Sequence, residues 1–225
     1  MKKYAVIVAG GSGTRMASAV PKQFLLLQQQ PVLWHTLQAF LEAFEDIHII
    51  VVLPAMHLEA GQAIAQSLSD SARITLTEGG ATRFHSVQKG LQLVKEEAVI
   101  FVHDGVRCLV SPRLIRQCYT QALEQGSAIP AVAATDSIRI VSTNQTHQVA
   151  DRNLVRIIQT PQTFHSAILL PAFEQAYSDA FTDEATVVEA TGQTVYLIEG
   201  EYNNIKITRP ADLLLAEQLL AERNR

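Results

Sequence analysis

Cysteine is scarce in this chain: among 225 residues only Cys108 and Cys118 occur. Two thiols are too few for a disulfide framework, and their spacing matches no zinc-binding pattern. We therefore expect two ordinary reduced cysteines, as in a cytoplasmic protein.

Long apolar runs and an excess of positive charge are also absent. The first apolar run, residues 4–10, is broken by Gly10 and is too short for a secretion signal. No segment approaches the ~20 apolar residues that a membrane helix needs. With 18 Lys and Arg against 22 Asp and Glu, the formal net charge is -4. A protein without an excess of positive charge is a poor nucleic-acid binder, so any anion site should be confined to a small part of the surface. We expect a soluble, cytoplasmic protein that binds neither nucleic acid nor membrane.

The apolar residues, 48% of the chain, are enough for one core, and we expect a single domain over residues 1–225. Short runs rich in Val and Ile alternate with segments of helical period, which predicts an α/β fold: a Rossmann-like, mostly parallel sheet flanked by helices. The predicted strands are residues 4–8, 47–53, 73–77, 98–102, 128–133 and 194–198. The predicted helices are residues 32–44, 56–68, 84–94, 112–123 and 210–221.

One segment, about residues 136–158, departs from this alternation. Two short apolar-rich stretches, residues 138–141 and 147–149, flank a polar turn, which is typical of a β-hairpin. A two-stranded ribbon is marginally stable alone in water, so its apolar face has to be covered. The sequence leaves two possibilities open: an arm that packs on a second subunit, or a hairpin that lies on its own domain.

The stretch AGGSGTRMASAVPK, residues 9–22, follows the first predicted strand and has the composition of a phosphate-binding loop. A dinucleotide fingerprint needs a third glycine where Met16 stands, and an acidic residue that is missing after the strand 47–53. A Walker loop cannot be written here either. The remaining features are glycine N–H groups that can approach an anion, together with Arg15 and Lys22. Neither cation is an evident nucleophile or base, so the pattern favours charge stabilisation during transfer at phosphorus.

Three later segments carry further candidate site residues. Asp104 follows a predicted central strand, at the sheet edge where α/β proteins bind ligands, and could hold Mg²⁺. The segment EGGATR, residues 78–83, brings two glycines to a turn where backbone could approach a nucleobase, with Ser86 close behind. Lys206 lies among apolar neighbours and could form a second phosphate contact, although an exposed strand edge would also explain it.

Six motifs follow one another along the chain: AGGSGTRM with PKQF, EGGATRFHSV, VHDGVR, DRNLVRIIQTPQTF, FTDEATVVEATG and NNIKITRPADL. In these motifs and in their order, the chain resembles the 2-C-methyl-D-erythritol 4-phosphate cytidylyltransferase family over nearly its whole length. The resemblance implies in-line attack of the acceptor phosphate on the α-phosphorus of CTP, with pyrophosphate as leaving group, in non-mevalonate isoprenoid synthesis. It also implies a Mg²⁺ requirement and a homodimer in which each arm serves the neighbour's site.

The resemblance assigns roles residue by residue. The implied catalytic cations are Arg15, Lys22, Arg152 and Lys206. The implied nucleotide contacts are Ala9, Gly10, Gly11, Ser12, Gly13, Gly80, Ala81 and Ser86. The implied acceptor contacts are Arg107, Ser137, Thr160 and Thr182, and the implied metal ligand is Asp104.

Several positions depart from the family's usual residues. Gly10 stands where a second alanine is frequent, which is closer to the related ribitol-5-phosphate cytidylyltransferases and to sugar-phosphate nucleotidyltransferases. Cys108 replaces a frequent proline, Ala81 an acidic residue and Ser137 a threonine. None of these removes a cation or the metal ligand, so the sequence leaves the acceptor open between methylerythritol and ribitol phosphates. A non-catalytic nucleotide-binding protein is the alternative from another class.

Overall fold

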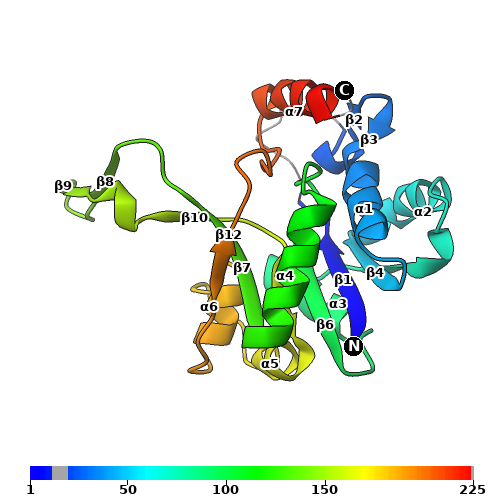
Figure 1. The fold of residues 1–225 in the computed structure, drawn as a ribbon, viewed down its shortest axis with the longest axis horizontal. Helices are drawn as coiled ribbons and strands as arrows, with labels where there is room; N and C mark the ends of the chain where they lie inside the picture. Colours follow the sequence, from blue (N-terminus) through cyan, green and yellow to red (C-terminus); the bar gives the residue numbers. More distant parts are fainter. Residues whose placement is uncertain (12–19, 224–225) are drawn as a thin grey trace.

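The computed structural model describes residues 1–11 and 20–223. In these ranges one central sheet holds eight strands. Four strands are mutually parallel in the order β5-β4-β1-β6, and β11 joins the far side of β6 antiparallel, followed by β7. Their bounds are β1 Lys2–Val8, β4 Ile47–Leu53, β5 Ile74–Glu78, β6 Ala98–Asp104, β7 Ser127–Ala133 and β11 Gln162–His165. The predicted mostly parallel α/β fold is confirmed (Figure 1).

Alternate residues of the central strands point to opposite faces of this sheet. On β1, Ala5 and Ile7 pack into one core, while Val6 packs into the other. The first core includes α1 (Val32–Ala43), α2 (Leu58–Gln66) and α4 (Pro112–Gln125). The second includes α3 (Arg83–Leu91), α5 (Ser166–Ala172) and α6 (Glu184–Glu189). A strand that is buried on both faces is apolar at nearly every position, and these strands were predicted from such continuous runs of Val and Ile.

Helix ends follow capping rules that the sequence already indicates. Ser111 caps α4 by accepting a hydrogen bond from the Leu114 N–H, and Gly126 ends the helix in the left-handed conformation at φ +85°. Asp183 caps α6 in a reciprocal arrangement with Thr186. The last helix, α7 (Pro210–Arg223), begins at the predicted residue 210, a proline, which the first turn of a helix tolerates.

The regular strands begin and end close to their predicted bounds, and the differences lie in short polar segments. The predicted strand at 194–198 is shorter, as β12 (Leu197–Glu199), and Arg73 belongs to a 3-10 turn that precedes β5. Sequence periodicity missed β10 (Arg156–Ile158), β11 and the small ribbon of β2 (Leu26–Leu27) with β3 (Gln30–Pro31). Runs of two to four residues are too short to show a period.

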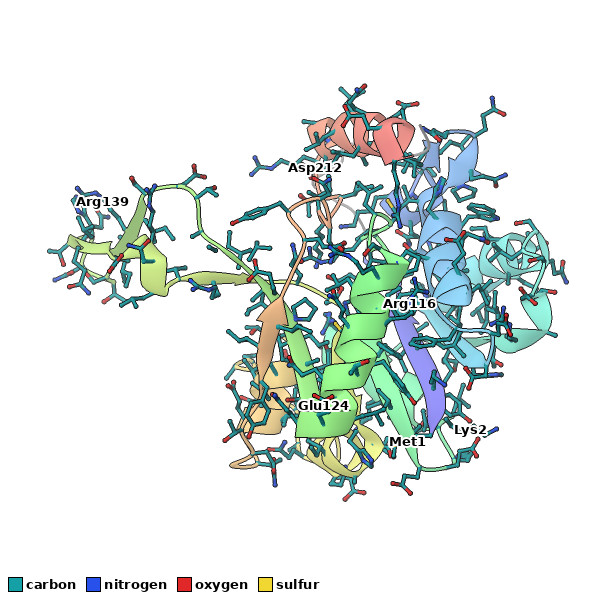
Figure 2. The ribbon with its side chains drawn as sticks, viewed as in Figure 1. Met1, Lys2, Arg116, Glu124, Arg139 and Asp212 are labelled. Carbon is teal, nitrogen blue, oxygen red and sulfur yellow. The ribbon has the colours of Figure 1, made fainter. Side chains whose placement is uncertain are left out.

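The predicted hairpin is present as β8 (Ile138–Val141) paired with β9 (His147–Ala150). It forms a two-stranded sheet of its own, and the ribbon stands away from the body of the molecule (Figure 1). Arg139 and its neighbouring side chains lie far from the central sheet (Figure 2). Strand β10 leads from the arm back to the edge of the sheet, beside β7.

A search of residues 1–11 and 20–223 finds no helix with the length and apolar content needed to span a bilayer.

Candidate active site

A cavity of about 730 Å³ opens at the carboxyl ends of β1, β5 and β6. Strand order reverses between β1 and β6, and crevices at such switch points are where α/β proteins bind ligands. Nine of the predicted site residues line it: Ala9, Gly10, Gly11, Lys22, Gly80, Ala81, Ser86, Asp104 and Lys206. Residues scattered over about two hundred positions therefore meet in one pocket.

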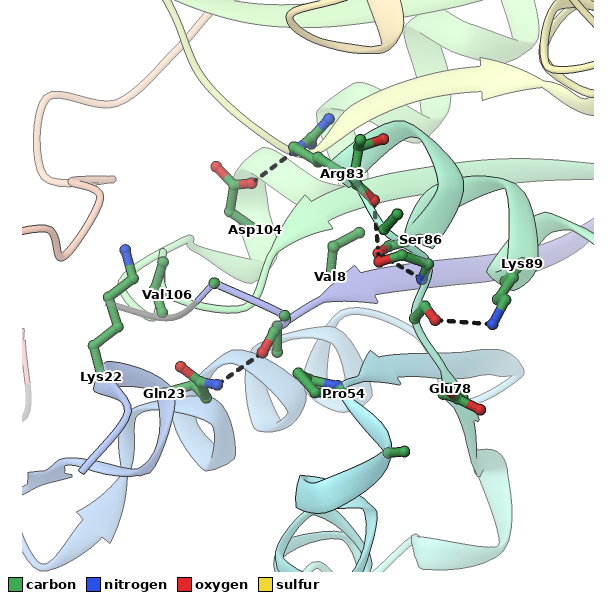
Figure 3. A pocket seen from close by; sticks show the side chains of 18 of the residues that line it. Val8, Lys22, Gln23, Pro54, Glu78, Arg83, Ser86, Lys89, Asp104 and Val106 are labelled. Atoms are coloured by element: carbon green, nitrogen blue, oxygen red, sulfur yellow. Dashed lines mark hydrogen bonds and ion pairs between the residues drawn. The ribbon is translucent and has the colours of Figure 1, made fainter. Parts of the chain in front are cut away.

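Lys22 stands at one end of the pocket, in a 3-10 turn held against the sheet (Figure 3). Its ammonium donates to the Ile207 carbonyl at 3.1 Å. The next residue, Gln23, is buried and donates to the Ala9 carbonyl at 2.8 Å. This bond ties the end of the first loop to its beginning, so the position of Lys22 is fixed relative to the end of β1.

Asp104 lies at the same end of the pocket and faces three cations. The Lys206 ammonium is 2.9 Å from one carboxylate oxygen, Arg107 Nε is 3.6 Å from that same oxygen, and Arg83 Nε is 3.4 Å from the other. Burial alone would raise the pKa of Asp104, but Arg83, Lys206 and Arg107 outweigh it and hold this pKa well below its usual range. The carboxylate is therefore ionised at all physiological pH values.

A buried side-chain pair holds Asp104 from behind. The Asp104 N–H donates to the Thr160 hydroxyl at 3.1 Å, and that hydroxyl lies 3.0 Å from His103 Nδ1. His103 Nε2 lies 3.1 Å from the Arg107 carbonyl, so the neutral ring can donate there and accept from Thr160. Burial lowers the pKa of His103 to about 3, and the ring therefore stays neutral. His103 therefore orients the Thr160 hydroxyl that holds Asp104.

Arg83 joins the pocket to helix α6 through a buried acid. Its two terminal nitrogens bond the two carboxylate oxygens of Glu184, with Nη2 at 3.1 Å. The Glu184 side chain is 1% exposed and that of Arg83 is 31% exposed. Burial would lower the pKa of Arg83, but Glu184 and Asp104 outweigh it and raise this pKa.

The opposite end of the pocket is built from backbone and small side chains. The Gly80 N–H donates to the Ser86 hydroxyl at 3.1 Å, and that hydroxyl donates to the Thr82 carbonyl at 2.9 Å. Lys89 donates to the Gly79 carbonyl at 2.9 Å, which fixes the glycine turn (Figure 3). A flat, polar-edged group such as a nucleobase can lie against such a wall.

Gly80→Ala is expected to raise KM for the nucleotide about tenfold or more, because a Cβ there would lie 2.4 Å from the His85 Cβ and 2.9 Å from its carbonyl carbon. Gly10→Ala is the matched control, since its Cβ would meet nothing closer than Pro54 Cδ at 3.9 Å. Steady-state kinetics with varied nucleotide checks both. Equal KM values in the two variants would show that the turn at Gly80 does not shape the site.

Other predicted site residues lie outside the cavity lining. Arg107 is mostly buried and donates to the Asn204 and Ile158 carbonyls at 2.8 and 3.4 Å. Thr160 is buried behind Asp104, and Thr182 is exposed just before α6. Ser137 is exposed beside the arm.

Arg152 lies at the base of the arm and is exposed. Its guanidinium donates to the Thr135 carbonyl at 2.8 Å. It is therefore not brought to the pocket of its own chain. Three more predicted site residues, Ser12, Gly13 and Arg15, fall outside the described ranges.

The sequence-based selection missed, among others, Gln23, Arg83, Glu184 and Lys89. Arg83 and Glu184 are 101 positions apart, and no sequence period relates them. Gln23 and Lys89 follow predicted site residues within one turn, so proximity to Lys22 and Ser86 was the available signal.

Magnesium is the metal that the sequence suggests for this pocket. In residues 1–11 and 20–223, no group of three or more His, Cys, Asp or Glu side chains could hold a metal ion alone. Mg²⁺ usually binds one or two carboxylates and completes its shell with water and substrate phosphates. A single ionised carboxylate in the lining of a pocket that also contains Lys22 and Lys206, as Asp104 is, fits that mode.

Comparisons with known proteins identify the family of this chain. The family model described as IspD, 2-C-methyl-D-erythritol 4-phosphate cytidylyltransferase, matches residues 4–222. The chain is similar to proteins of that name from Phocaeicola vulgatus, with 41% identity over 98% of this chain and 100% of the relative, and from Porphyromonas gingivalis, with 44% identity over 97% and 98%.

Solved structures agree as well. One is a 4-diphosphocytidyl-2C-methyl-D-erythritol synthase from Anaerococcus prevotii, with a TM-score of 0.84, 26% identity, and 98% and 96% coverage of the two chains. Another is a 2-C-methyl-D-erythritol 4-phosphate cytidylyltransferase from Thermus thermophilus, with a TM-score of 0.78, 30% identity, and 98% and 100% coverage. The pocket at the switch point and these full-length similarities lead to one conclusion: this chain belongs to the family of 2-C-methyl-D-erythritol 4-phosphate cytidylyltransferases.

Proposed function

We propose that the pocket binds CTP with its base against the Gly80 and Ser86 wall and its phosphates beside Lys22 and Asp104. In the family's reaction, CTP and 2-C-methyl-D-erythritol 4-phosphate give 4-diphosphocytidyl-2-C-methyl-D-erythritol and pyrophosphate, a step of isoprenoid precursor synthesis. One observation carries the orientation: Lys22 and Asp104, with Lys206 beside it, lie at one end of the cavity, and the glycine turn before Ser86 forms the other (Figure 3).

The reaction is a single in-line displacement at phosphorus. An oxygen of the acceptor phosphate forms a bond to the α-phosphorus, and the bond from that phosphorus to the α,β-bridging oxygen breaks, so the electron pair leaves with pyrophosphate. The acceptor oxygen is already ionised, so no general base is needed. Positioning and stabilisation of the developing charge do most of the work. We assign the stabilisation to Lys22 and to Arg15, to which the resemblance gives the same role.

Asp104 is the residue proposed to hold Mg²⁺ together with the triphosphate oxygens. Bound there, the ion would neutralise part of the phosphate charge. Lys206, whose ammonium lies beside Asp104, is in position to bind the acceptor phosphate at the same end of the pocket. Arg107 and Thr160 contribute by holding Asp104, and Ser137 and Thr182 are proposed as acceptor contacts because the resemblance places them there.

The arm is proposed to form a homodimer and to deliver Arg152 to the partner's pocket. Its apolar side chains are exposed in the single chain: Ile140 at 55%, Val141 at 66%, Val149 at 71% and Leu154 at 83%. A two-stranded ribbon with such a surface needs a covering partner. Arg152 follows β9 and does not line the pocket of its own chain, which supports its use by a second subunit.

An acceptor panel tests the proposed function. With CTP and Mg²⁺ present, we expect pyrophosphate release with 2-C-methyl-D-erythritol 4-phosphate and no release without acceptor. Release with ribitol 5-phosphate alone would move the acceptor assignment to that polyol. Calorimetric CTP binding with no release for either acceptor would support a binding protein instead.

A further inference from the structure

Glu184 is a buried acid that the reaction itself does not use. It begins α6, two residues after Thr182, and its carboxylate points into the same interior as Arg83. Helix capping does not explain it, because Asp183 supplies the cap. Burying a carboxylate costs free energy unless the carboxylate is paired. The pairing of Glu184 with Arg83 offsets that cost, and its effect on the pocket has to be sought at Arg83.

The pairing decides how Arg83 meets Asp104. Both terminal nitrogens of the guanidinium are directed to Glu184, and only Nε reaches Asp104, at 3.4 Å. A planar guanidinium that formed two hydrogen bonds to Asp104 instead would occupy both carboxylate oxygens. Glu184 therefore withdraws the strongest available competitor from the carboxylate at the phosphate end of the pocket.

The second arginine at Asp104 is held back in the same manner. Arg107 donates to the Asn204 and Ile158 carbonyls, and its Nε stays 3.6 Å from Asp104. The closest cation is then Lys206, a single point charge on a flexible chain that is 39% exposed. An ammonium of this kind can move aside for a divalent ion far more readily than a guanidinium held in two hydrogen bonds.

We infer that Glu184 is a positioning residue: by holding Arg83 in two hydrogen bonds, it keeps the Asp104 carboxylate available to a divalent cation bound with the nucleotide. This inference rests on the proposed metal role of Asp104. It makes α6, which begins beside the proposed acceptor contact Thr182, part of the support of the nucleotide site.

The test measures metal binding directly, without turnover. Mn²⁺ retention in the presence of CTP is followed by electron paramagnetic resonance of free Mn²⁺, in wild type, Asp104→Asn, Glu184→Gln and the double variant Arg83→Gln/Glu184→Gln. Glu184→Gln is expected to weaken Mn²⁺ binding roughly tenfold or more, the usual effect of losing a residue that orients a metal ligand. The double variant should regain wild-type affinity, because the competing cation is removed together with the group that restrains it.

The controls separate this role from general stability. Ser111→Ala removes the cap of α4 outside the pocket, so it should lower stability and leave Mn²⁺ affinity unchanged. The double variant buries no uncompensated charge, and it keeps the test available if Glu184→Gln does not fold.

Wild-type affinity in Glu184→Gln, or a double variant that binds Mn²⁺ about tenfold more weakly than wild type, would overturn the inference. If Asp104→Asn retains Mn²⁺ like wild type, the metal assignment itself fails, and the inference with it. Loss in Asp104→Asn but not in Glu184→Gln rejects the inference alone.

Discussion

Lys22→Ala is expected to lower kcat by about 10²-fold or more while CTP still binds. The ammonium stands at the phosphate end of the pocket, and its position is fixed by the Ile207 carbonyl and by the Gln23 bond to Ala9. A group held in this way before substrate arrives stabilises developing charge without reorganisation, and losing one such donor typically costs this much in turnover. The base is expected to bind at the other end of the pocket, which this substitution does not change. The substitution should therefore lower kcat and leave CTP affinity nearly unchanged.

Single-turnover kinetics and calorimetric CTP titration measure the two parts of this prediction. Lys89→Ala is the matched control: it removes a second pocket lysine, one that bonds the Gly79 carbonyl beside the base wall. Lys89→Ala should raise KM for CTP and change kcat little, the reverse of Lys22→Ala. Wild-type kcat in folded Lys22→Ala would remove Lys22 from the catalytic set.

The central sheet could be predicted because a strand that is buried on both faces appears in the sequence as a continuous apolar run. Strand β4 is apolar at every position but one, and its predicted bounds at 47 and 53 match the structure. Strand β11 has no such apolar run, since Gln162 and Thr163 are polar yet buried. They are buried because β6 and β7 flank β11, and the sequence around β11 contains no sign of that pairing.

The pocket could be predicted where its residues follow strand ends. Asp104 and the glycines after β1 and β5 are placed by the parallel sheet, because the carboxyl ends of such strands meet at one edge. Lys22 and Lys206 were each predicted from the local sequence as a phosphate contact, but only the motif resemblance put them in one site, since no local pattern relates residues so far apart in the chain. Glu184 could be predicted only as part of a helix start; its pairing with Arg83 depends on how α6 packs against α3.

Mixed dimers of Arg152→Ala and Lys22→Ala subunits are expected to recover activity that neither homodimer has. Each homodimer should lose about 10²-fold, because each of its sites lacks one cation. In the mixed dimer, the Arg152→Ala subunit keeps its own Lys22 and receives an intact Arg152 from its partner. The other site lacks both cations. One complete site in two gives roughly half the wild-type activity per dimer.

The result depends on the arm crossing between subunits, which the geometry of the single chain favours. The ribbon of β8 and β9 stands away from the central sheet (Figure 1). Arg152, which follows β9, is exposed and does not line the pocket of its own chain. If Arg152 served its own subunit, one site of the mixed dimer would lack Arg152 and the other Lys22, and no activity would return. Two affinity tags, purified in sequence, isolate the mixed dimer, and a dimer of two wild-type subunits with the same tags sets the reference. Recovery toward half of that reference activity would show that the arm completes the neighbour's site. No recovery would show that the arm only joins the subunits.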